Sequence, residues 1–265
     1  MKIFIFGANG MLGNYLNSYL NKKYNVIPLT RKDFDISNIN IGEYKEDIKK
    51  IISKNDLIIN AAGVIKQRNS DNLNMLLVNG VFPNILAEIK MEIGCNVIHI
   101  TTDCVFNGDS GSYKEDDAHD CLDHYGRTKS LGENHINTNI RTSIIGEEIY
   151  NKMSIVEWLI SQKNLEINGY DNHLWNGLTC LELCKFIEKI IINKNYWKGI
   201  KHVFSPEVIT KYTLSNIING IYNLNLVINK YDTDNHCYRN LNSYYENEIE
   251  STISDQIKEM KNFTF

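Results

Sequence analysis

A glycine-rich turn near the start of the chain restricts the fold more than any other feature. Residues 7–13 run Gly-Ala-Asn-Gly-Met-Leu-Gly and directly follow the apolar run 2–6. We expect Gly7 to allow a tight turn out of a strand, Gly10 to let the backbone approach a phosphate, and Gly13 to let a helix pack on the sheet. The helix start adds unpaired N–H groups and a positive dipole end. The turn therefore predicts a dinucleotide pyrophosphate site, with a plain glycine-containing loop as the alternative.

Apolar runs alternate with amphipathic segments along residues 1–146. The expected strands are 3–6, 26–29, 57–60, 96–101 and 140–145, and the expected helices are 11–20, 41–53, 75–93 and 125–136. Strands that alternate with helices of this length indicate βαβ units and a parallel sheet. Right-handed crossovers place helices on both faces of such a sheet. The sequence predicts an α/β fold, a doubly wound parallel sheet of the Rossmann type, with its ligands at one edge.

The rhythm is less regular in residues 147–265. Helices are expected at 154–162, 181–192 and 213–222, and short strands at 202–205 and 226–229. We expect these residues to form mainly a smaller α+β lobe that binds the substrate. A strand near 200–206 is expected to complete the sheet of the first domain.

Composition narrows the possible partners. The 265 residues carry a formal net charge of -4, and without a polybasic block we expect no nucleic-acid partner. No apolar run approaches the ~20 residues of a membrane span, and the first residues lack signal-peptide features, so a cytoplasmic protein without membrane contact is expected. The six cysteines lack metal-site spacing, which indicates reduced thiols and no metal.

Two motifs that follow the strand expected at 96–101 suit carbonyl reduction. Thr101-Thr102-Asp103 ends that strand, and Tyr125 and Lys129 are spaced as Tyr-x-x-x-Lys. Reduction of a ketone needs a hydride donor and a proton donor at the oxygen. A neighbouring ammonium and an oxidised nicotinamide both lower the pKa of a tyrosine from its usual ~10. Lys129 lies one helical turn from Tyr125 and can also reach ribose hydroxyls, while Thr102 can bind the substrate carbonyl. A surface helix pair is the alternative for Tyr-x-x-x-Lys alone.

The end of the second expected strand bears on the choice of nicotinamide cofactor. An acidic residue there usually meets a ribose 2′-hydroxyl, whereas a basic residue meets a 2′-phosphate. Thr30, Arg31 and Lys32 come first, and Asp33 comes only afterwards. We therefore predict NADPH, bound in part by Arg31. NADH, with Arg31 as a solvated surface charge, is the alternative.

Together these strings resemble the extended short-chain dehydrogenases, specifically the dTDP-4-dehydrorhamnose reductase branch. The matching segments are 6–13, 60–63, 78–79, 101–108, 125–129, 132–133 and 141–143. The resemblance implies Thr102, Tyr125 and Lys129 as the catalytic triad. The three glycines, Arg31, Tyr125 and Lys129 are expected at the cofactor from the arguments above. The resemblance adds Asn9, Met11, Leu12, Asn60, Ala61, Ala62 and Asn79 to these cofactor-binding residues.

The resemblance also implies a substrate and partners. The substrate is a nucleotide-linked 4-keto-6-deoxyhexose supplied by an upstream 4,6-dehydratase, and the oligomer expected by analogy with the fold is a homodimer. The residues expected at the substrate are Thr102, Asp103, Cys104, Val105, Phe106 and Tyr125.

Cys104 departs from the family pattern, because the reductases of dTDP-4-keto-rhamnose usually have tyrosine there. Cysteine at this place resembles the bifunctional 3,5-epimerase/4-reductase of UDP-rhamnose synthesis and related reductases of capsule amino sugars. Epimerisation beside a ketone needs a base and an acid on opposite ring faces, and a thiolate next to Thr102 can serve as one of them. A small buried thiol without a chemical role is the alternative. Lys152 and Glu157 are the candidates for its partner.

Three further readings stay open. The substrate can be an N-acetylated keto-sugar nucleotide for capsule or glycan synthesis. The alternative to an enzyme is a regulatory subunit: the chain is also similar to the regulatory subunit of methionine adenosyltransferase, which binds the cofactor while assisting another enzyme. Lys66 is a candidate contact to the nucleotide diphosphate, and Trp158 and Trp175 can stack on a base or sugar or pack in the core.

Overall fold

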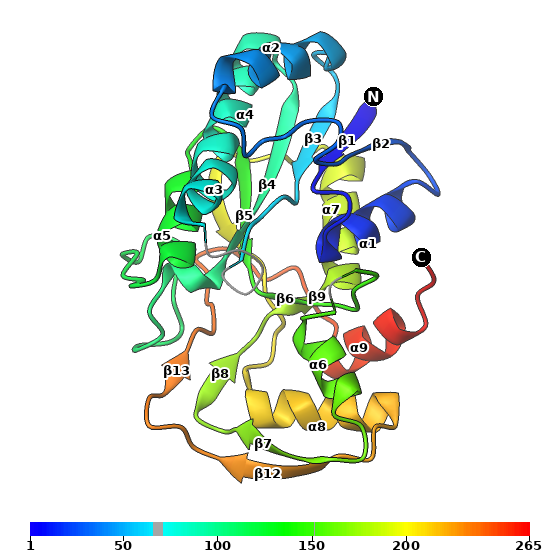
Figure 1. Ribbon diagram of the computed structural model, residues 1–265, viewed down its shortest axis with the longest axis vertical. Helices are drawn as coiled ribbons and strands as arrows, with labels where there is room; N and C mark the ends of the chain where they lie inside the picture. The colour runs from blue at the N-terminus through cyan, green and yellow to red at the C-terminus, as the bar shows by residue number, and fades with distance from the viewer. Residues whose placement is uncertain (66–70, 151) are drawn as a thin grey trace.

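A six-stranded parallel sheet forms the centre of the computed structural model, which describes residues 1–65, 71–150 and 152–265. Its strand order is β10-β5-β4-β3-β1-β2. These strands are β1 (Lys2–Phe6), β2 (Asn25–Leu29), β3 (Leu57–Asn60), β4 (Asn96–Thr102), β5 (Thr138–Thr142) and β10 (Gly199–His202). β2 and β3 lie on opposite sides of β1, so the direction of winding reverses there and opens a crevice at the carboxyl ends. The predicted doubly wound parallel sheet is confirmed (Figure 1).

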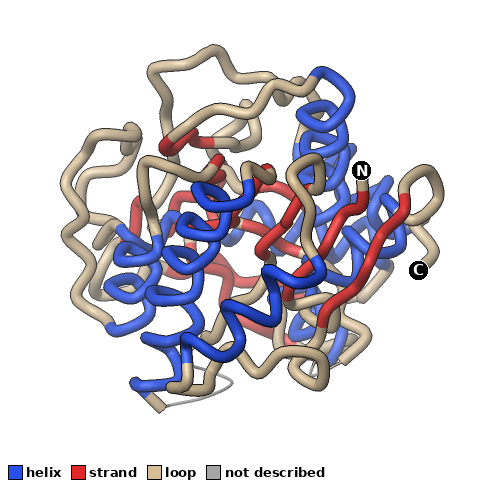
Figure 2. The backbone as a smooth tube through the Cα atoms, turned by 90° about the horizontal axis from the view of Figure 1, so that it is seen from above, coloured by secondary structure: helices blue, strands red, loops and turns tan. Residues whose placement is uncertain are grey.

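Helices cover both faces of the sheet because alternate side chains of each strand point to opposite sides. Ile3 and Ile5 pack in one apolar cluster with residues of α1 (Met11–Leu20) and α7 (Cys180–Asn193). Phe4 and Phe6 pack in a second cluster, on the other face, with residues of α2 (Ile41–Ile51) and α4 (Phe82–Ile93). Figure 2 shows the strands enclosed between these helical layers. The two clusters hold the strand ends in fixed register.

The helix predicted at 75–93 contains an irregular turn. α3 (Asn72–Leu76) continues into a π-helical turn at Leu77–Val81 and then into α4. Pro83 has no N–H to donate to the carbonyl of Asn79, four residues earlier, which favours a local change of helix type. π-helical turns are rare and are found mostly at functional sites.

Other predicted boundaries shift by a few residues. The helix predicted at 125–136 is α5 (His124–Gly132), since Glu133 adopts an extended backbone conformation. The strand predicted at 140–145 divides into β5 and β6 (Ile144–Ile145), and β6 pairs with β9 (Leu178–Thr179). The strand predicted at 202–205 lies three residues earlier, as β10, and pairs with β5.

A smaller lobe lies beyond the carboxyl ends of the sheet (Figure 1). Its helices are α6 (Ile155–Ser161), α8 (Lys211–Tyr222) and α9 (Ile253–Lys261). Its strands are β7 (Glu166–Tyr170) paired with β12 (Val227–Tyr231), and β8 (His173–Trp175) between β11 (Ile209–Thr210) and β13 (Cys237–Tyr238). In the part of the chain that the structure describes, no helix is both long and apolar enough to cross a membrane.

Candidate active site

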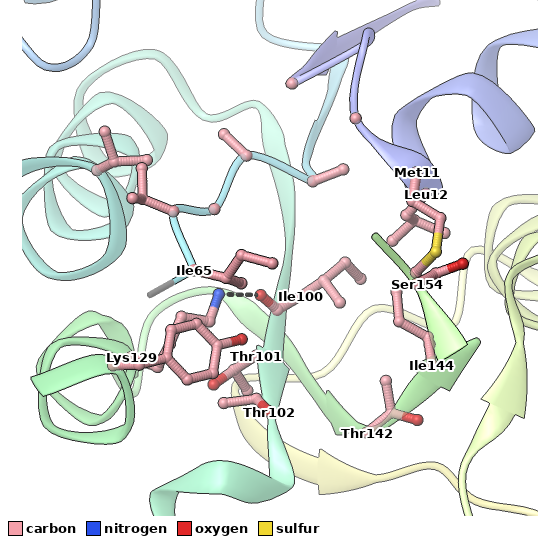
Figure 3. Close-up of a pocket in the computed structure, with 18 of the residues that line it drawn as sticks. Met11, Leu12, Ile65, Ile100, Thr101, Thr102, Lys129, Thr142, Ile144 and Ser154 are labelled. Carbon is pink, nitrogen blue, oxygen red and sulfur yellow. Dashed lines mark hydrogen bonds between the residues drawn. The ribbon is translucent and has the colours of Figure 1, made fainter. Parts of the chain in front are cut away.

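A cavity of about 570 Å³ lies between the carboxyl ends of the sheet strands and the smaller lobe. This is the edge at which open parallel sheets bind their ligands. The glycine turn and the ends of β1, β2 and β3 form one side, and the ends of β4 and β5 with α5 form the other. In Figure 3, Met11 and Leu12 lie across the cavity from Thr102 and Lys129. Trp175 and Lys211 extend the lining into the lobe.

The glycine turn has the geometry that a pyrophosphate site requires. Gly7 has φ +79°, and a Cβ there would lie 2.7 Å from the backbone of Ala62. A Cβ on Gly13 would lie 2.1 Å from the carbonyl oxygen of Gly7, so only glycine allows α1 to start this close to β1. Gly10 is the N-cap of α1 and has no side chain to satisfy the first N–H groups. The open helix start, facing the cavity at Gly10 and Met11, fits a phosphate.

The turn after β2 places the Arg31 guanidinium at the cavity, whereas the Asp33 carboxylate forms hydrogen bonds within the turn. Thr30 and Arg31 both line the cavity. Asp33 accepts hydrogen bonds from the backbone N–H and the hydroxyl of Thr30, both at 2.8 Å, and these bonds lower the pKa of Asp33. Arg31 is exposed, with its Nε 4.0 Å from an Asp35 oxygen. A guanidinium, not a free carboxylate, is therefore the charged group offered at this end of the cavity.

Tyr125 and Lys129 extend from α5 toward the end of β4. Asp123 caps this helix by accepting a hydrogen bond from the N–H of Gly126 at 2.7 Å. The buried Lys129 Nζ donates to the carbonyl oxygen of Ile100 at 2.8 Å (Figure 3), and burial lowers the pKa of Lys129 to about 8. Tyr125 and Thr102 both line the cavity beside it.

The phenol of Tyr125 is protonated at neutral pH. Burial raises its pKa, the neighbouring Cys104 raises it further, and a hydrogen bond with Thr102 acts in the opposite direction. The lowered pKa expected from the sequence depends on an oxidised nicotinamide beside the phenol. In the protein alone, desolvation and Cys104 outweigh the hydrogen bond with Thr102, so Tyr125 carries its proton at neutral pH.

Two buried asparagines support the cavity wall from behind. Asn60 accepts a hydrogen bond from the N–H of Ala62 at 3.2 Å, and its amide lies 3.1 Å from Nδ1 of His99. Asn79, in the π-helical turn, exchanges two 2.9 Å hydrogen bonds with the backbone of Val64 and donates to Thr128. Ala61 and Ala62 themselves line the cavity, whereas the asparagine side chains fix the loop that carries them.

Cys104 lines the cavity as a protonated thiol. Its Sγ donates to Asp103 Oδ1 at 3.5 Å and accepts from Arg239 Nη1 at 3.4 Å. Burial and Asp103 raise the pKa of Cys104 to about 12, against the effect of Arg239. Asp103 is itself buried, accepts from the Thr102 hydroxyl at 3.1 Å and lines the same wall.

Sequence reasoning missed Lys211 and Arg239, which complete this wall from the smaller lobe. Lys211 begins α8, lines the cavity and lies over the Trp175 ring at 4.8 Å. Burial lowers its pKa, and Asp103 and Cys104 raise it. Neither cation belongs to a sequence motif, and each comes from an element more than 100 residues after Cys104, so no local signal identified them.

Several predicted residues lie outside the cavity lining. Val105 and Phe106 are fully buried behind the wall, where Phe106 stacks on Tyr113 with centroids 4.2 Å apart. Lys152 is exposed, and Glu157 accepts from the N–H of Glu148, so neither faces Cys104. Gly13, Asn60 and Asn79 also lie outside the lining, as do Asn9 and Trp158, which are exposed. Lys66 is not among the described residues.

Comparison with known proteins gives a consistent family assignment. The profile of the RmlD substrate binding domain matches residues 1–146. A dTDP-4-dehydrorhamnose reductase from Aggregatibacter actinomycetemcomitans is 30% identical over 230 residues, which cover 80% of this chain and 76% of that protein. With several other curated relatives, the match spans about half of their length.

Solved structures share the whole fold. A dTDP-4-dehydrorhamnose reductase from Clostridium acetobutylicum superposes with a TM-score of 0.82 at 22% identity, covering 99% of both chains. The Bacillus anthracis reductase, solved in complex with NADP, has a TM-score of 0.82 at 21% identity and covers 98% of both chains. Since the profile covers more than half of the chain and the Aggregatibacter relative matches most of it, this protein belongs to the RmlD family of extended short-chain dehydrogenases, the family of the dTDP-4-dehydrorhamnose reductases.

Proposed function

We propose that this protein reduces the 4-keto group of a nucleoside-diphosphate 4-keto-6-deoxyhexose with NADPH. The observation that carries the proposal is that Thr102, Tyr125 and Lys129 line the same cavity as the glycine turn. The Aggregatibacter relative, which matches 80% of this chain, is named dTDP-4-dehydrorhamnose reductase. The similar Bacillus anthracis structure was solved in complex with NADP. In this proposal a 4,6-dehydratase supplies the substrate, and the protein works in the cytoplasm as a homodimer.

The domain assignment follows the two sides of the cavity. We propose that residues 1–146, completed by β10, bind the cofactor, and that most of residues 147–265 bind the substrate. The Gly7–Gly13 turn and the start of α1 would hold the pyrophosphate, and Arg31 would meet the 2′-phosphate. When bound, NADPH supplies the hydride that the carbonyl carbon receives.

The chain's own residues then handle the carbonyl oxygen. The Thr102 hydroxyl turns its proton from Asp103 to the substrate oxygen and orients it. Tyr125 donates the proton that turns this oxygen into a hydroxyl. Lys129 has a buried ammonium beside this site, so it stabilises the phenolate that remains and contacts the ribose. With its pKa raised, Tyr125 is protonated at neutral pH, and the Lys129 ammonium favours release of that proton to the substrate oxygen.

The test is NADPH oxidation by the purified protein with UDP- or dTDP-4-keto-6-deoxyglucose, with and without a separate 3,5-epimerase. NMR then identifies the sugar product. Oxidation only with the epimerase supports a plain reductase, and oxidation without it supports a bifunctional enzyme. If neither substrate is reduced, N-acetylated keto-sugars are tested next. No turnover of any keto-sugar, with tight binding to an unrelated enzyme, would favour the regulatory-subunit alternative and overturn the proposal.

A 3,5-epimerase activity is the second candidate function, and the Cys104 environment favours it. The thiol of Cys104 is protonated, so it would donate a proton to carbon and not remove one. Unlike Lys152 and Glu157, Lys211 lines the cavity, where it lies on the same wall as Cys104 and burial lowers its pKa. In this scheme a base on the opposite face of the ring removes the proton beside the ketone, and the resulting enolate takes a proton from the Cys104 thiol, which becomes a thiolate.

A further inference from the structure

Glu133 is the C-cap residue that directly follows α5, on the side that carries the proposed catalytic residues. Tyr125, Lys129 and Glu133 follow one another at intervals of four, so their side chains lie on one side of the helix. Lys129 is anchored to β4 at the Ile100 carbonyl. Glu133 is anchored at the next residue, where its Oε1 accepts from the hydroxyl of Thr101 at 2.7 Å.

Arg141 holds the carboxylate of Glu133 in place. Its Nε donates to Oε1 at 3.0 Å and its Nη2 donates to Oε2 at 2.5 Å, a bidentate pair. The side chain of Arg141 is 0% exposed and that of Glu133 is 2% exposed. Arg141 lies on β5 directly beside Thr101 of β4, so strand register sets both partners of Glu133.

Two histidines complete the arginine's hydrogen bonds without adding charge. The Arg141 guanidinium donates to Nε2 of His202 at 2.8 Å and to Nε2 of His119 at 2.6 Å. Both rings must therefore offer a lone pair. Burial lowers the pKa of both, that of His202 to about 4. Neither ring therefore competes with Arg141 and Lys129 for the negative charge of Glu133.

We propose that Glu133, fixed by Thr101 and Arg141, is a positioning residue that serves as the counter-charge of the buried Lys129 ammonium. The inference rests on the proposed function for its relevance to catalysis, but not for its test. Among the described residues, the titratable groups that act on the charge of Lys129 are Glu133 at the C-cap of α5, and Cys104 and His99 from the strand side. His99 is neutral because burial holds its pKa far below the usual range, and Cys104 is protonated, so Glu133 is the charged group that opposes burial.

The experiment follows the titration of Lys129 directly in the protein without substrate. Lysine is labelled at Cε and Nζ, and Lys129→Met identifies the signal. Glu133→Gln should move the titration of Lys129 about one pH unit lower, since one opposite charge nearby shifts a pKa by this order. Glu133→Asp, which keeps the charge, should restore most of the shift. Thr101→Val removes a tether and no charge, and should change the titration much less.

Glu133→Gln leaves Arg141 buried without its carboxylate and can fail to fold. In that case Arg141→Gln is compared with the double variant Glu133→Gln/Arg141→Gln. These two proteins differ only in the carboxylate of Glu133. A lower titration pH in the double variant supports the proposal. An unchanged Lys129 titration on loss of the carboxylate, or an equal shift in Thr101→Val, would overturn it. Because no keto-sugar is used, failure here is distinct from failure of the proposed reduction.

Discussion

The Arg239 guanidinium donates a hydrogen bond to the Cys104 sulfur at 3.4 Å, joining residues 135 positions apart. Cys104 follows β4 of the sheet, and Arg239 follows β13 of the smaller lobe. The active-site wall is therefore assembled from both parts of the chain. Cys104 therefore has its Arg239 contact only when the smaller lobe is folded against the sheet.

Tyr125→Phe tests the proton donor. The substitution removes the hydroxyl and keeps the ring, so we expect turnover of the keto-sugar to fall by roughly 10²–10⁴-fold. NADPH affinity, measured by fluorescence titration, should stay nearly unchanged. Retention of most of the activity would show that another group delivers the proton.

The pH dependence of reduction should follow the ammonium of Lys129. Burial lowers its pKa to about 8, so the charged form predominates below that pH and is lost above it. We expect kcat/KM to be maximal below about pH 8 and to decline as pH rises through that value. Arginine stays charged at any accessible pH, so a Lys129→Arg variant with residual activity should lack this decline. A wild-type profile that is flat to pH 10 would contradict the assignment.

Arg31 should determine the preference for NADPH over NADH. Loss of a charged hydrogen bond costs about 1.5–3 kcal/mol, so Arg31→Ala should weaken NADPH binding by roughly 10–150-fold and leave NADH nearly unchanged. Lys32→Ala is the matched control, since Lys32 is an exposed neighbour outside the cavity lining. Equal effects of the two substitutions would indicate a general surface-charge effect.

Gly13→Ala should disturb both stability and cofactor binding. The new Cβ would lie 2.1 Å from the carbonyl oxygen of Gly7, so α1 must move away from the turn. Overpacking of this kind lowers the free energy of unfolding by about 1–3 kcal/mol, measurable by urea denaturation. Gly220→Ala, in α8 with nothing within 4 Å of its Cβ, should instead stabilise the protein by roughly 0.5–1 kcal/mol.

The sequence predicted the parts of the site that local patterns encode. Gly7 and Gly13 lie at a turn where close backbone contacts select glycine, and Thr102, Tyr125 and Lys129 lie at strand ends or at helical spacing. The alternation of strands and helices was enough to predict the parallel sheet, because the spacing of apolar residues within each segment indicates its type.

The remaining site features depend on tertiary packing and leave no local trace. Lys211 reaches the cavity, and Arg239 reaches Cys104, only because the smaller lobe folds against the sheet. Val105 and Phe106 belong to a matching string, yet the chain turns after Cys104 and buries both. Burial raises the pKa of Tyr125 in the protein alone, and sequence spacing does not report this desolvation.

Cys104→Ala separates the two proposed activities. Epimerisation exchanges the hydrogens on carbons 3 and 5 with solvent, so deuterium from D₂O enters the sugar when NADPH is absent. We expect Cys104→Ala to abolish this incorporation, measured by NMR, because the protonated thiol is the proposed proton donor to carbon. Reduction of an already epimerised substrate should continue, since Thr102, Tyr125 and Lys129 remain. Cys95→Ala, a buried thiol in the apolar cluster around α4, is the matched control and should leave both activities intact. Equal loss of exchange and reduction in Cys104→Ala would contradict separate roles, and deuterium incorporation that persists would leave Cys104 as a packing residue.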